Sequence, residues 1–475
     1  MRDRDQDTIC AVSTPAGVGG ISVVRVSGPA ALSVVRALCS FLPEKIVSHH
    51  AYYGVLQSLQ FKSDGDPIDE VVVTYFQKGR SFTGEDTLEI SCHGSPAIVR
   101  QILDELISAG ARSADRGEFT YRSFMNGRMD LVQAEGVLAL IESQSAQSSR
   151  QALRQLQGQL SQSLETIEND LIWCLAHIEA SIDFSTEGLE VVEEKALLAK
   201  VREIEERLLK LVESFKKGRL LRDGFQLVLT GIPNVGKSSL LNLLVEDEKA
   251  IVTEIPGTTR DLIEASFITD GLKVNVIDTA GLRESEDRVE KIGIERSYSA
   301  QKEADGIFFV FDSSKPLSTE ELRELSKLDL SRTFFVGNKK DQGPLLADQR
   351  VDSFYQQLQS VQKLQGFNKD LKEKIHIVSA FDKTDGDRLK SLLRKSLGES
   401  LYEDQAVISQ ARHFENLQSA LSNMKEAQGL VGQGASPELT ALSMKEALLK
   451  VQETLGKRFD DQIMDRVFKE FCIGK

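Results

Sequence analysis

Gly231-Ile-Pro-Asn-Val-Gly-Lys-Ser238 is the stretch of this 475-residue chain that decides its fold. An apolar run, residues 226–230, precedes it and predicts a strand, and residues 239–244 follow it with the spacing of a helix. GxxxxGK[ST] between a strand and a helix is a phosphate-binding loop, because its glycines let backbone N–H groups close around phosphate oxygens. We therefore expect an α/β domain here that binds a nucleotide.

Two side chains of this loop carry phosphate chemistry. Lys237 is expected to reach the β and γ phosphates and to act in catalysis, and the Ser238 hydroxyl is expected to ligate Mg²⁺. The N-terminus of the following helix adds a favourable partial charge. An ordinary glycine-rich turn is the alternative, and the flanking strand and helix argue against it.

Two later motifs specify the nucleotide. Asp278-Thr-Ala-Gly281 follows a predicted strand at residues 274–277; its aspartate can hold Mg²⁺ through water, and the Gly281 N–H can sense the γ phosphate. Asn338-Lys-Lys-Asp341 follows another predicted strand, residues 333–337, and resembles the NKxD motif of GTPases. A carboxylate there accepts hydrogen bonds from two donors of guanine that adenine lacks, which discriminates strongly. We therefore predict a GTPase.

A further and weaker GTPase motif is Ser379-Ala380, which follows a predicted strand at residues 375–378. Phe381 stands where this motif usually has a lysine. The residues expected to contact the nucleotide are Asn234, Val235, Gly236, Lys237, Ser238, Ser239, Thr253, Glu254, Ile255, Pro256, Gly257, Thr258, Thr259, Asp278, Thr279, Ala280, Gly281, Asn338, Lys339, Lys340, Asp341, Ser379 and Ala380.

The group that orients the attacking water is unusual. Many small GTPases place a glutamine directly after the DxxG glycine, but here that position is Leu282, which cannot hydrogen-bond water. Hydrolysis is therefore very slow, or another group takes the role; the downstream candidates are Arg283, Glu284, Glu286 and Glu290. From the residues alone, each of these acids is more simply a solvated charge.

Two more metal ligands are expected. Thr259 is placed to ligate Mg²⁺ when the γ phosphate is present. The Asn234 side-chain carbonyl, with loop carbonyls, could hold a monovalent cation that neutralises charge as an arginine finger otherwise does.

Composition limits the remaining function classes. The formal net charge is −14, so any RNA contact must use a local basic patch or a partner, and no DNA partner is expected. Five well-separated cysteines without a CxxC pair argue against a disulfide framework and a zinc site. No apolar run reaches the roughly 18 residues of a membrane span, and the polar start is no targeting peptide. A cytoplasmic protein without membrane contact is expected.

Local composition and the spacing of apolar residues along the chain predict a multidomain fold of the α/β and α classes. Short β-rich runs, residues 21–26 and 70–76, and a helix at residues 96–109 indicate an N-terminal α+β domain. Leu, Ile, Ala, Gln and Glu at helical spacing dominate both sides of the alternating strands and helices around the phosphate loop. The predicted domains are an N-terminal α+β domain (1–125), a discontinuous helical domain (126–223 and 398–475) and an inserted P-loop GTPase domain (224–397).

Further motifs are spread along the chain. They are Ser13-Thr-Pro-Ala-Gly-Val-Gly-Gly20, Val24-Arg-Val-Ser-Gly28, Ser81-Phe-Thr-Gly-Glu-Asp86, Leu88-Glu89, Arg116-Gly-Glu-Phe119, Asp130-Leu-Val-Gln-Ala-Glu135, Pro256-Gly-Thr-Thr-Arg-Asp261, Asp278-Thr-Ala-Gly-Leu-Arg-Glu284, Glu290-Lys-Ile-Gly-Ile-Glu295 and Phe471-Cys-Ile-Gly-Lys475. With them the chain resembles the MnmE (TrmE) family of tRNA-modification GTPases along essentially its whole length.

The resemblance implies partners and a reaction. Family members form homodimers through the N-terminal domain and act with a flavoprotein, MnmG, so that a heterotetramer is expected and FAD belongs only to that partner. Together they install an aminomethyl or carboxymethylaminomethyl group on the wobble uridine of certain tRNAs. The resemblance also implies that Glu290 is the general base acting through water, and that Asn234, Thr253, Ile255 and Thr258 coordinate K⁺ between two G domains.

A one-carbon donor is also implied. The family binds 5-formyl- or 5,10-methylene-tetrahydrofolate, and the matching positions are Arg25, Glu89, Arg128 and Lys475. Arg and Lys can pair with the folate carboxylate, and Glu89 can accept hydrogen bonds from the pterin ring. Cys472 matches the family too; we expect a buried or site-lining thiol, and a structural and a catalytic role both remain open. His93 has no paired cysteine or carboxylate at a useful spacing, so a packed histidine is expected.

Two other functions compete. A ribosome-assembly checkpoint GTPase would have a similar G domain, but it usually carries a basic RNA-binding module, which the acidic balance and the absence of a GXXG segment disfavour. A helical scaffold whose dimerisation is controlled by nucleotide would need no folate.

Overall fold

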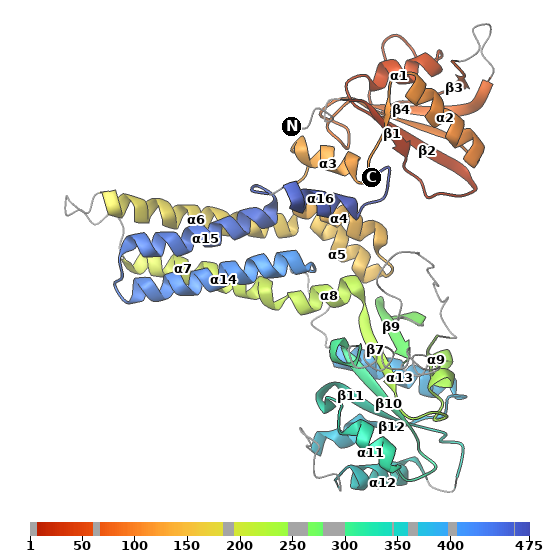
Figure 1. The fold of residues 1–475 in the computed structure, drawn as a ribbon, viewed down its shortest axis with the longest axis vertical. Coiled ribbons are helices and arrows are strands. Elements are labelled where there is room, and N and C mark those ends of the chain that lie inside the picture. Colours follow the sequence, from red (N-terminus) through yellow and green to blue (C-terminus); the bar gives the residue numbers. More distant parts are fainter. Residues whose placement is uncertain are drawn as a thin grey trace, which may run out of the picture. The chain divides into compact units, whose positions relative to one another are not determined.

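The computed structural model describes residues 7–59, 67–183, 194–245, 265–278, 300–343, 346–359, 369–397, 406–459 and 461–475. The chain divides into two compact units (Figure 1). The first comprises Met1–Ile141, Ala152–Val212 and Arg412–Lys475, and the second comprises Glu142–Gln151 and Glu213–Ala411. Among the described residues, no helix combines the length and the apolar character that a bilayer crossing requires.

A six-stranded sheet in the order β3-β4-β5-β2-β1-β6 begins the first unit. Its strands are β1 (Ile9–Val12), β2 (Gly19–Ser27), β3 (Ala51–Gln57), β4 (Pro67–Phe76), β5 (Thr87–Gly94) and β6 (Arg112–Ser113). Neighbouring strands run antiparallel except β1 and β6, which are parallel. The strands predicted at residues 21–26 and 70–76 lie within β2 and β4 and are confirmed.

Helices α1 (Ala31–Leu38) and α2 (Pro96–Ser108) bury their apolar stripes on this sheet. Residues Val24 and Val26 of β2 enter the same core, so the intervening Arg25 points to the opposite face of the sheet. The predicted helix at residues 96–109 corresponds to α2. The alternation along β2 therefore separates the core from the residues of a candidate site.

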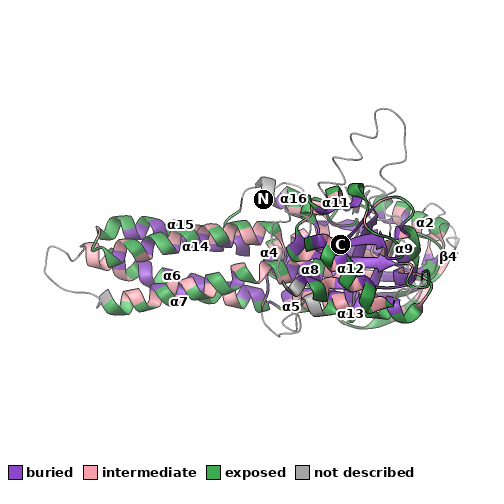
Figure 2. Cartoon of the chain, turned by 90° about the horizontal axis from the view of Figure 1, so that it is seen from below, coloured by how far each residue is buried: buried purple, intermediate pink, exposed green. Residues whose placement is uncertain are grey.

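The rest of the first unit is helical. Its helices are α3 (Glu118–Met125), α4 (Leu131–Glu142), α5 (Ala146–Leu156), α6 (Gln159–Asp183), α7 (Glu194–Glu213), α14 (Ala411–Gly432), α15 (Pro437–Leu455) and α16 (Asp461–Lys469), of which α4, α5, α7 and α14 extend past the limits of the unit. The long helices α6, α7, α14 and α15 lie side by side, and buried and exposed residues alternate along them (Figure 2). Helices from before and after the second unit in sequence thus share one bundle, which confirms the predicted discontinuous helical domain.

A buried cluster of charged groups joins the two halves of this helical part. The Glu135 carboxylate on α4 accepts hydrogen bonds from Arg412 Nε (3.0 Å) and is bonded to His413 Nε2 (2.6 Å) on α14. Arg412 also donates to the carbonyls of Glu453 and Thr454 at the end of α15. The Glu135 and His413 side chains are only 4% and 0% exposed, so a buried polar contact joins α14 to α4 where the chain returns to the bundle.

The second unit is an α/β domain whose sheet has the order β12-β11-β10-β7-β9-β8. Its main elements are α8 (Phe215–Asp223), β7 (Phe225–Thr230), α9 (Lys237–Val245), β8 (Ala265–Thr269), β9 (Leu272–Asp278), β10 (Gly306–Asp312), α11 (Thr319–Leu325), β11 (Thr333–Asn338), α12 (Ala347–Gln359), β12 (Ile375–Ile377) and α13 (Lys383–Leu397). All neighbouring strands are parallel except β8 and β9. The predicted P-loop α/β fold is confirmed.

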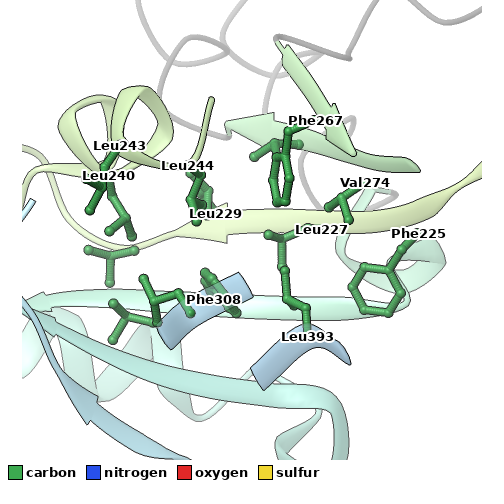
Figure 3. Packing of buried hydrophobic residues seen from close by; sticks show 14 of the residues in the cluster. Phe225, Leu227, Leu229, Leu240, Leu243, Leu244, Phe267, Val274, Phe308 and Leu393 are labelled. Atoms are coloured by element: carbon green, nitrogen blue, oxygen red, sulfur yellow. The ribbon is translucent and has the colours of Figure 1, made fainter. Parts of the chain in front are cut away.

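The core of this unit lies against both faces of the central strands. Figure 3 shows Leu227 and Leu229 of β7 among leucines of α9 and α13, with Phe308 of β10 beside them. A second cluster, which includes Phe309, Phe335 and Phe354, packs α12 against the other face. Because the sheet is parallel, the carboxyl ends of β7, β9, β10, β11 and β12 meet at one edge, where ligands bind in open α/β sheets.

Candidate nucleotide-binding site

The predicted phosphate loop connects β7 to α9. Gly231 and Gly236 have φ angles of 145° and 95°, and an added Cβ would collide with the Val310 carbonyl at Gly231 and with the Asn338 side chain at Gly236. Only glycine fits these positions, because the backbone is both left-handed and closely packed. The loop thus leaves its backbone N–H groups at the N-terminus of α9, the arrangement that binds an anion.

Lys237 is the first residue of α9, and it is only 5% exposed. Its Nζ donates hydrogen bonds to the carbonyls of Gly231 (2.9 Å) and Ile232 (3.0 Å). The ammonium group therefore lies inside the curve of the loop. Val235 is buried, whereas Asn234, Ser238 and Ser239 are exposed.

Asp278, the last residue of β9, is 3% exposed. It is paired in register with Leu229, so its carboxylate lies beside the strand that leads into the phosphate loop. The structure thus brings an aspartate next to the loop that carries Ser238. The other predicted residues between β7 and β10 lie outside the described residues; they are Thr253, Glu254, Ile255, Pro256, Gly257, Thr258, Thr259, Thr279, Ala280, Gly281, Leu282, Arg283, Glu284, Glu286 and Glu290.

Asn338 is the hub between the phosphate loop and the base-reading motifs. Its Nδ2 donates to the Val235 carbonyl (2.9 Å), and its Oδ1 accepts from the Ala380 N–H (3.1 Å). It ends β11, and its side chain is almost fully buried. One side chain therefore connects three motifs that lie up to 145 positions apart in the sequence.

The Asp341 carboxylate is oriented by Ser379, whose hydroxyl donates to Asp341 Oδ1 over 2.8 Å. The Ser379 N–H in turn donates to Asp385 Oδ2 at 2.9 Å, which anchors this loop to α13. The Lys340 ammonium also reaches Asp385, at 3.3 Å. An oriented carboxylate at this edge of the sheet can accept the two donors of guanine.

Lys339 has a φ of 64°, and its ammonium pairs with Asp312 Oδ2 at 2.9 Å. Burial would raise the pKa of the Asp312 carboxyl, but hydrogen bonds from Ser314 and Lys339 outweigh it and lower the pKa to about 2. Asp312 is therefore ionised at neutral pH, and the ion pair holds the Lys339 side chain at the end of β10.

Arg350 of α12 is a residue of this site that the sequence analysis missed. Its guanidinium donates to Ser313 Oγ (2.9 Å) and to the carbonyls of Lys339 (3.0 Å), Gln342 and Gly343 (3.3 Å). It is 3% exposed. Arg350 lies at helical spacing from Phe354 and Leu358, on the buried side of α12. A charged residue in such an apolar stripe is the sequence signal that could have revealed Arg350.

The first unit brings together three of the four residues predicted to bind folate. Arg25 of β2 faces Glu89 of β5 and donates to its carboxylate from Nε (3.0 Å) and Nη2 (2.7 Å). The Arg25 guanidinium also lies 5.5 Å from the ring centroids of Phe82 and Phe119. Burial and the nearby charge of Arg25 lower the pKa of the Lys475 ammonium, so Lys475 lies within electrostatic reach of this pair, although no ion pair between Lys475 and Glu89 is among the contacts of the described residues.

Arg128 lies between α3 and α4, and it contacts the loop between β4 and β5 that carries Phe82. It is exposed, donates to the Gly79 carbonyl (3.1 Å), and packs its stem near Gly84. No contact between Arg128 and the other three residues is among those of the described chain.

The C-terminal segment packs against the start of α3. The Gly117 N–H donates to the Cys472 carbonyl (3.3 Å), Ile473 forms a β-bridge with Arg116, and Ser13 Oγ donates to the Gly474 carbonyl (3.2 Å). The expectation of a buried Cys472 thiol is wrong, because this pairing leaves the side chain exposed. The alternative of a thiol that lines the neighbouring site remains a prediction.

The expectation of a packed His93 is also wrong. Its side chain is 68% exposed, and its Nδ1 lies 2.6 Å from Asp69 Oδ1. The carboxylate that sequence spacing did not reveal comes from β4, the strand that precedes β5 in the chain and pairs with it in the sheet.

The chain is similar to known proteins along essentially its whole length. A family model described as the MnmE helical domain matches residues 131–472, and one described as the GTP-binding protein TrmE N-terminus matches residues 8–128. A tRNA modification GTPase MnmE from Bdellovibrio bacteriovorus is 56% identical over 475 residues, covering 100% of this chain and 98% of that protein. The protein of the same name from Natranaerobius thermophilus is 38% identical over 474 residues, covering 99% of this chain and 100% of that protein. Among solved structures, Aquifex aeolicus Era bound to GDP.AlF4⁻ is 23% identical and covers 42% of this chain and 66% of that chain, with a TM-score of 0.28.

Proposed function

The chain belongs to the MnmE (TrmE) family of tRNA modification GTPases, and from that premise we propose how its residues perform this function. It is a GTP hydrolase that acts in tRNA modification. The observation that carries the assignment of the site is the Asn338 side chain, which ties the phosphate loop at Val235 to the base-reading loop at Ala380. We propose that GTP binds across this bridge, with phosphates at Lys237 and guanine at Asp341.

Mg²⁺ fits the donors that the site offers. The Ser238 hydroxyl and the Asp278 carboxylate are hard oxygen donors, which Mg²⁺ prefers, and they belong to adjacent chain segments at the carboxyl ends of β7 and β9. We propose that Ser238 ligates the ion, that Asp278 holds it through water, and that Thr259 adds a ligand in the GTP state. The bound ion would neutralise charge on the phosphates.

We further propose a K⁺ ion beside the phosphate loop. Asn234 is exposed and has a left-handed backbone (φ 64°), so its side chain is free of the core. The family resemblance supplies the other ligands, Thr253, Ile255 and Thr258, and the role of Glu290 as general base through water. K⁺ bound there would support the pairing of two G domains.

The cluster of Arg25, Glu89 and Lys475 suits a tetrahydrofolate one-carbon donor, 5-formyl- or 5,10-methylene-tetrahydrofolate. Arg25 pairs with Glu89, and the Lys475 ammonium adds a second positive charge within electrostatic reach, so positive charge remains to bind the folate glutamate while Glu89 retains acceptor capacity for the pterin. Arg128 is proposed as a further contact. The Cys472 thiol lies three residues from Lys475 and is exposed toward solvent.

A homodimer through the N-terminal domain is supported by one face of its sheet. Tyr53 and Val72 are register partners and are 68% and 38% exposed, and Ile21, opposite His93 on the same face, is 69% exposed. Apolar side chains gathered on one uncovered face mark an interaction surface. We propose that a second copy covers this face, and that the dimer joins an MnmG-like flavoprotein, which brings FAD, in a heterotetramer.

The proposed product is 5-carboxymethylaminomethyl- or 5-aminomethyl-uridine at the wobble position of certain tRNAs, made in the cytoplasm. The test is mass spectrometry of tRNA nucleosides from cells that lack the protein. We expect the modified wobble uridines to disappear, to return with the unchanged gene, and to stay absent with Lys237→Ala. Modified uridines at normal levels in the deleted cells would refute this function.

The two competing functions fit less well. Relatives that match the chain over its whole length carry the name tRNA modification GTPase, which disfavours a ribosome-assembly checkpoint. A nucleotide-controlled scaffold would not need the two cations around Glu89. We also propose that the domains of this chain meet at positions 125/126, 223/224 and 397/398.

A further inference from the structure

Phe381 is an aromatic side chain in an unusual setting. It is 86% exposed, and it belongs to none of the three described apolar clusters of the α/β domain. It follows Ser379 and Ala380, whose polar groups contact the proposed guanine-reading residues. The most solvated phenyl ring of the described α/β domain therefore lies at the proposed base site rather than at a random point of the surface.

The backbone at Phe381 is held firmly although its ring is not. The Phe381 N–H donates to Ser379 Oγ (3.4 Å), and that hydroxyl donates to Asp341 Oδ1 (2.8 Å), so two hydrogen bonds separate the Phe381 amide from the carboxylate. On the other side, the Ala380 N–H is bonded to Asn338 Oδ1. A turn closed by the Asp382 N–H on the Ser379 carbonyl (3.0 Å) then leads into α13. The Cα of Phe381 is thus fixed next to the carboxylate.

We infer that Phe381 is a base-binding residue of the nucleotide site, whose ring stacks on the guanine base that Asp341 reads. Guanine is a flat aromatic ligand, and every base presents a π face to an aromatic side chain. Covering the exposed ring with the base removes apolar surface from water on both sides. The lysine usual at this position offers only an aliphatic stem, so this chain gains an aromatic contact there.

The inference rests on the proposed role of Asp341, and the test separates the two. Phe381→Ala removes a ring that packs against nothing in the described core, so the fold should be unaffected. Base–aromatic stacking corresponds to a factor of about 5 to 150 in affinity. We expect the Kd of GDP to rise by that factor in Phe381→Ala, less in Phe381→Tyr, and the affinity for inorganic pyrophosphate, which has no base, to stay unchanged.

A spectroscopic measurement reports the stacking directly. Trp173, on α6, is the single tryptophan of the chain, so Trp173→Phe removes all native indole emission. In the double variant Trp173→Phe, Phe381→Trp, saturation with GDP should strongly quench the introduced indole, whereas pyrophosphate should not. A GDP Kd within twofold of the unchanged protein in Phe381→Ala, or indole emission that GDP leaves unaltered, would overturn the inference. Failure of the unchanged protein to bind GDP would instead refute the nucleotide site itself.

Discussion

The side-chain amide of Asn338 donates a hydrogen bond of 2.9 Å to the main-chain carbonyl of Val235, across 103 positions of sequence. Asn338, the donor, is the last residue of β11 and belongs to the motif proposed to read guanine, and Val235, the acceptor, lies in the phosphate loop. Because Asn338 is buried and its Oδ1 also holds Ala380, a single residue keeps the phosphate loop and the base-reading loops in register. We therefore propose that binding of the two ends of a nucleotide is coupled through this side chain.

Asn338→Ala should weaken both folding and nucleotide binding. The substitution leaves the buried Val235 carbonyl and Ala380 N–H without this partner, at a cost of about 1–3 kcal/mol. We expect a lower midpoint of urea unfolding and a Kd for GDP that rises about tenfold. Asn126→Ala, which removes a similar hydrogen bond to the Thr83 carbonyl in the first unit, serves as the control and should leave GDP binding intact. An unaltered GDP Kd in Asn338→Ala would show that the bridge does not couple the loops.

Folate binding should depend on pH through Lys475. Burial and Arg25 lower the pKa of its ammonium, so the charged form is lost at a lower pH than for an ordinary lysine. Since the charged form is the one proposed to bind the folate carboxylate, the affinity for 5-formyltetrahydrofolate should fall as the pH rises through this pKa. Isothermal titration of the protein with 5-formyltetrahydrofolate between about pH 7 and pH 10 checks this. That interval lies below the ordinary lysine pKa of about 10.4. Lys475→Met should bind more weakly and with a flat profile; an equally steep profile in that variant contradicts the assignment.

GTP hydrolysis should require K⁺ through Asn234. We expect hydrolysis to be markedly faster in KCl than in NaCl at the same ionic strength. Asn234→Gly removes the side-chain carbonyl but accepts the left-handed backbone at φ 64°, so the loop itself is not strained. This variant should hydrolyse GTP at the same slow rate in both salts. Equal rates in both salts for the unchanged protein would eliminate the cation.

The Glu135–His413 pair should make the helical bundle sensitive to acid. Burial would raise the pKa of Glu135, but the charges and hydrogen bonds of His413 and Arg412 outweigh it and lower the pKa. A carboxyl with a lowered pKa stabilises the fold above its unfolded pKa and loses that contribution as the pH falls through the folded value. Glu135→Ala leaves the buried His413 ring and the Arg412 guanidinium without their carboxylate partner and should cost about 3–5 kcal/mol of unfolding free energy.

The matched control for that substitution is Glu426→Ala on the exposed side of α14, which should change the unfolding free energy by less than about 0.5 kcal/mol. Urea titrations of both variants at pH 7 and at pH 4 provide the comparison. If Glu135→Ala were as stable as Glu426→Ala, the cluster would not join the two halves of the helical part.

Local patterns predicted the strands and helices of this protein well. The strand, loop and helix around Gly231 were readable because glycine spacing, an apolar strand and an apolar helix agree within twenty residues. The alternation of Val24, Arg25 and Val26 likewise predicts which side chain leaves the core. The two segments of the helical part could be predicted because residues with helical spacing dominate the sequence on both sides of the α/β domain.

Contacts between distant segments were not readable in the same way. Arg350 reaches the loop after β11 from a helix, and no spacing rule relates its position to Lys339. His93 finds Asp69 only because β4 and β5 pair in one register, and Cys472 is exposed only because the following residue bridges to Arg116. Each of these depends on pairing that a single sequence leaves open.

The most direct test of the central claim is equilibrium binding of GDP and ADP to the purified protein in the presence of Mg²⁺. Because Asp341 and Asn338 are proposed to read guanine, we expect GDP to bind at least about a hundredfold more tightly than ADP. Because Lys237 is proposed to bind the phosphates, we expect the Lys237→Ala variant to lose its affinity for GDP. Equal affinity for both nucleotides, or no binding of either, would contradict the account.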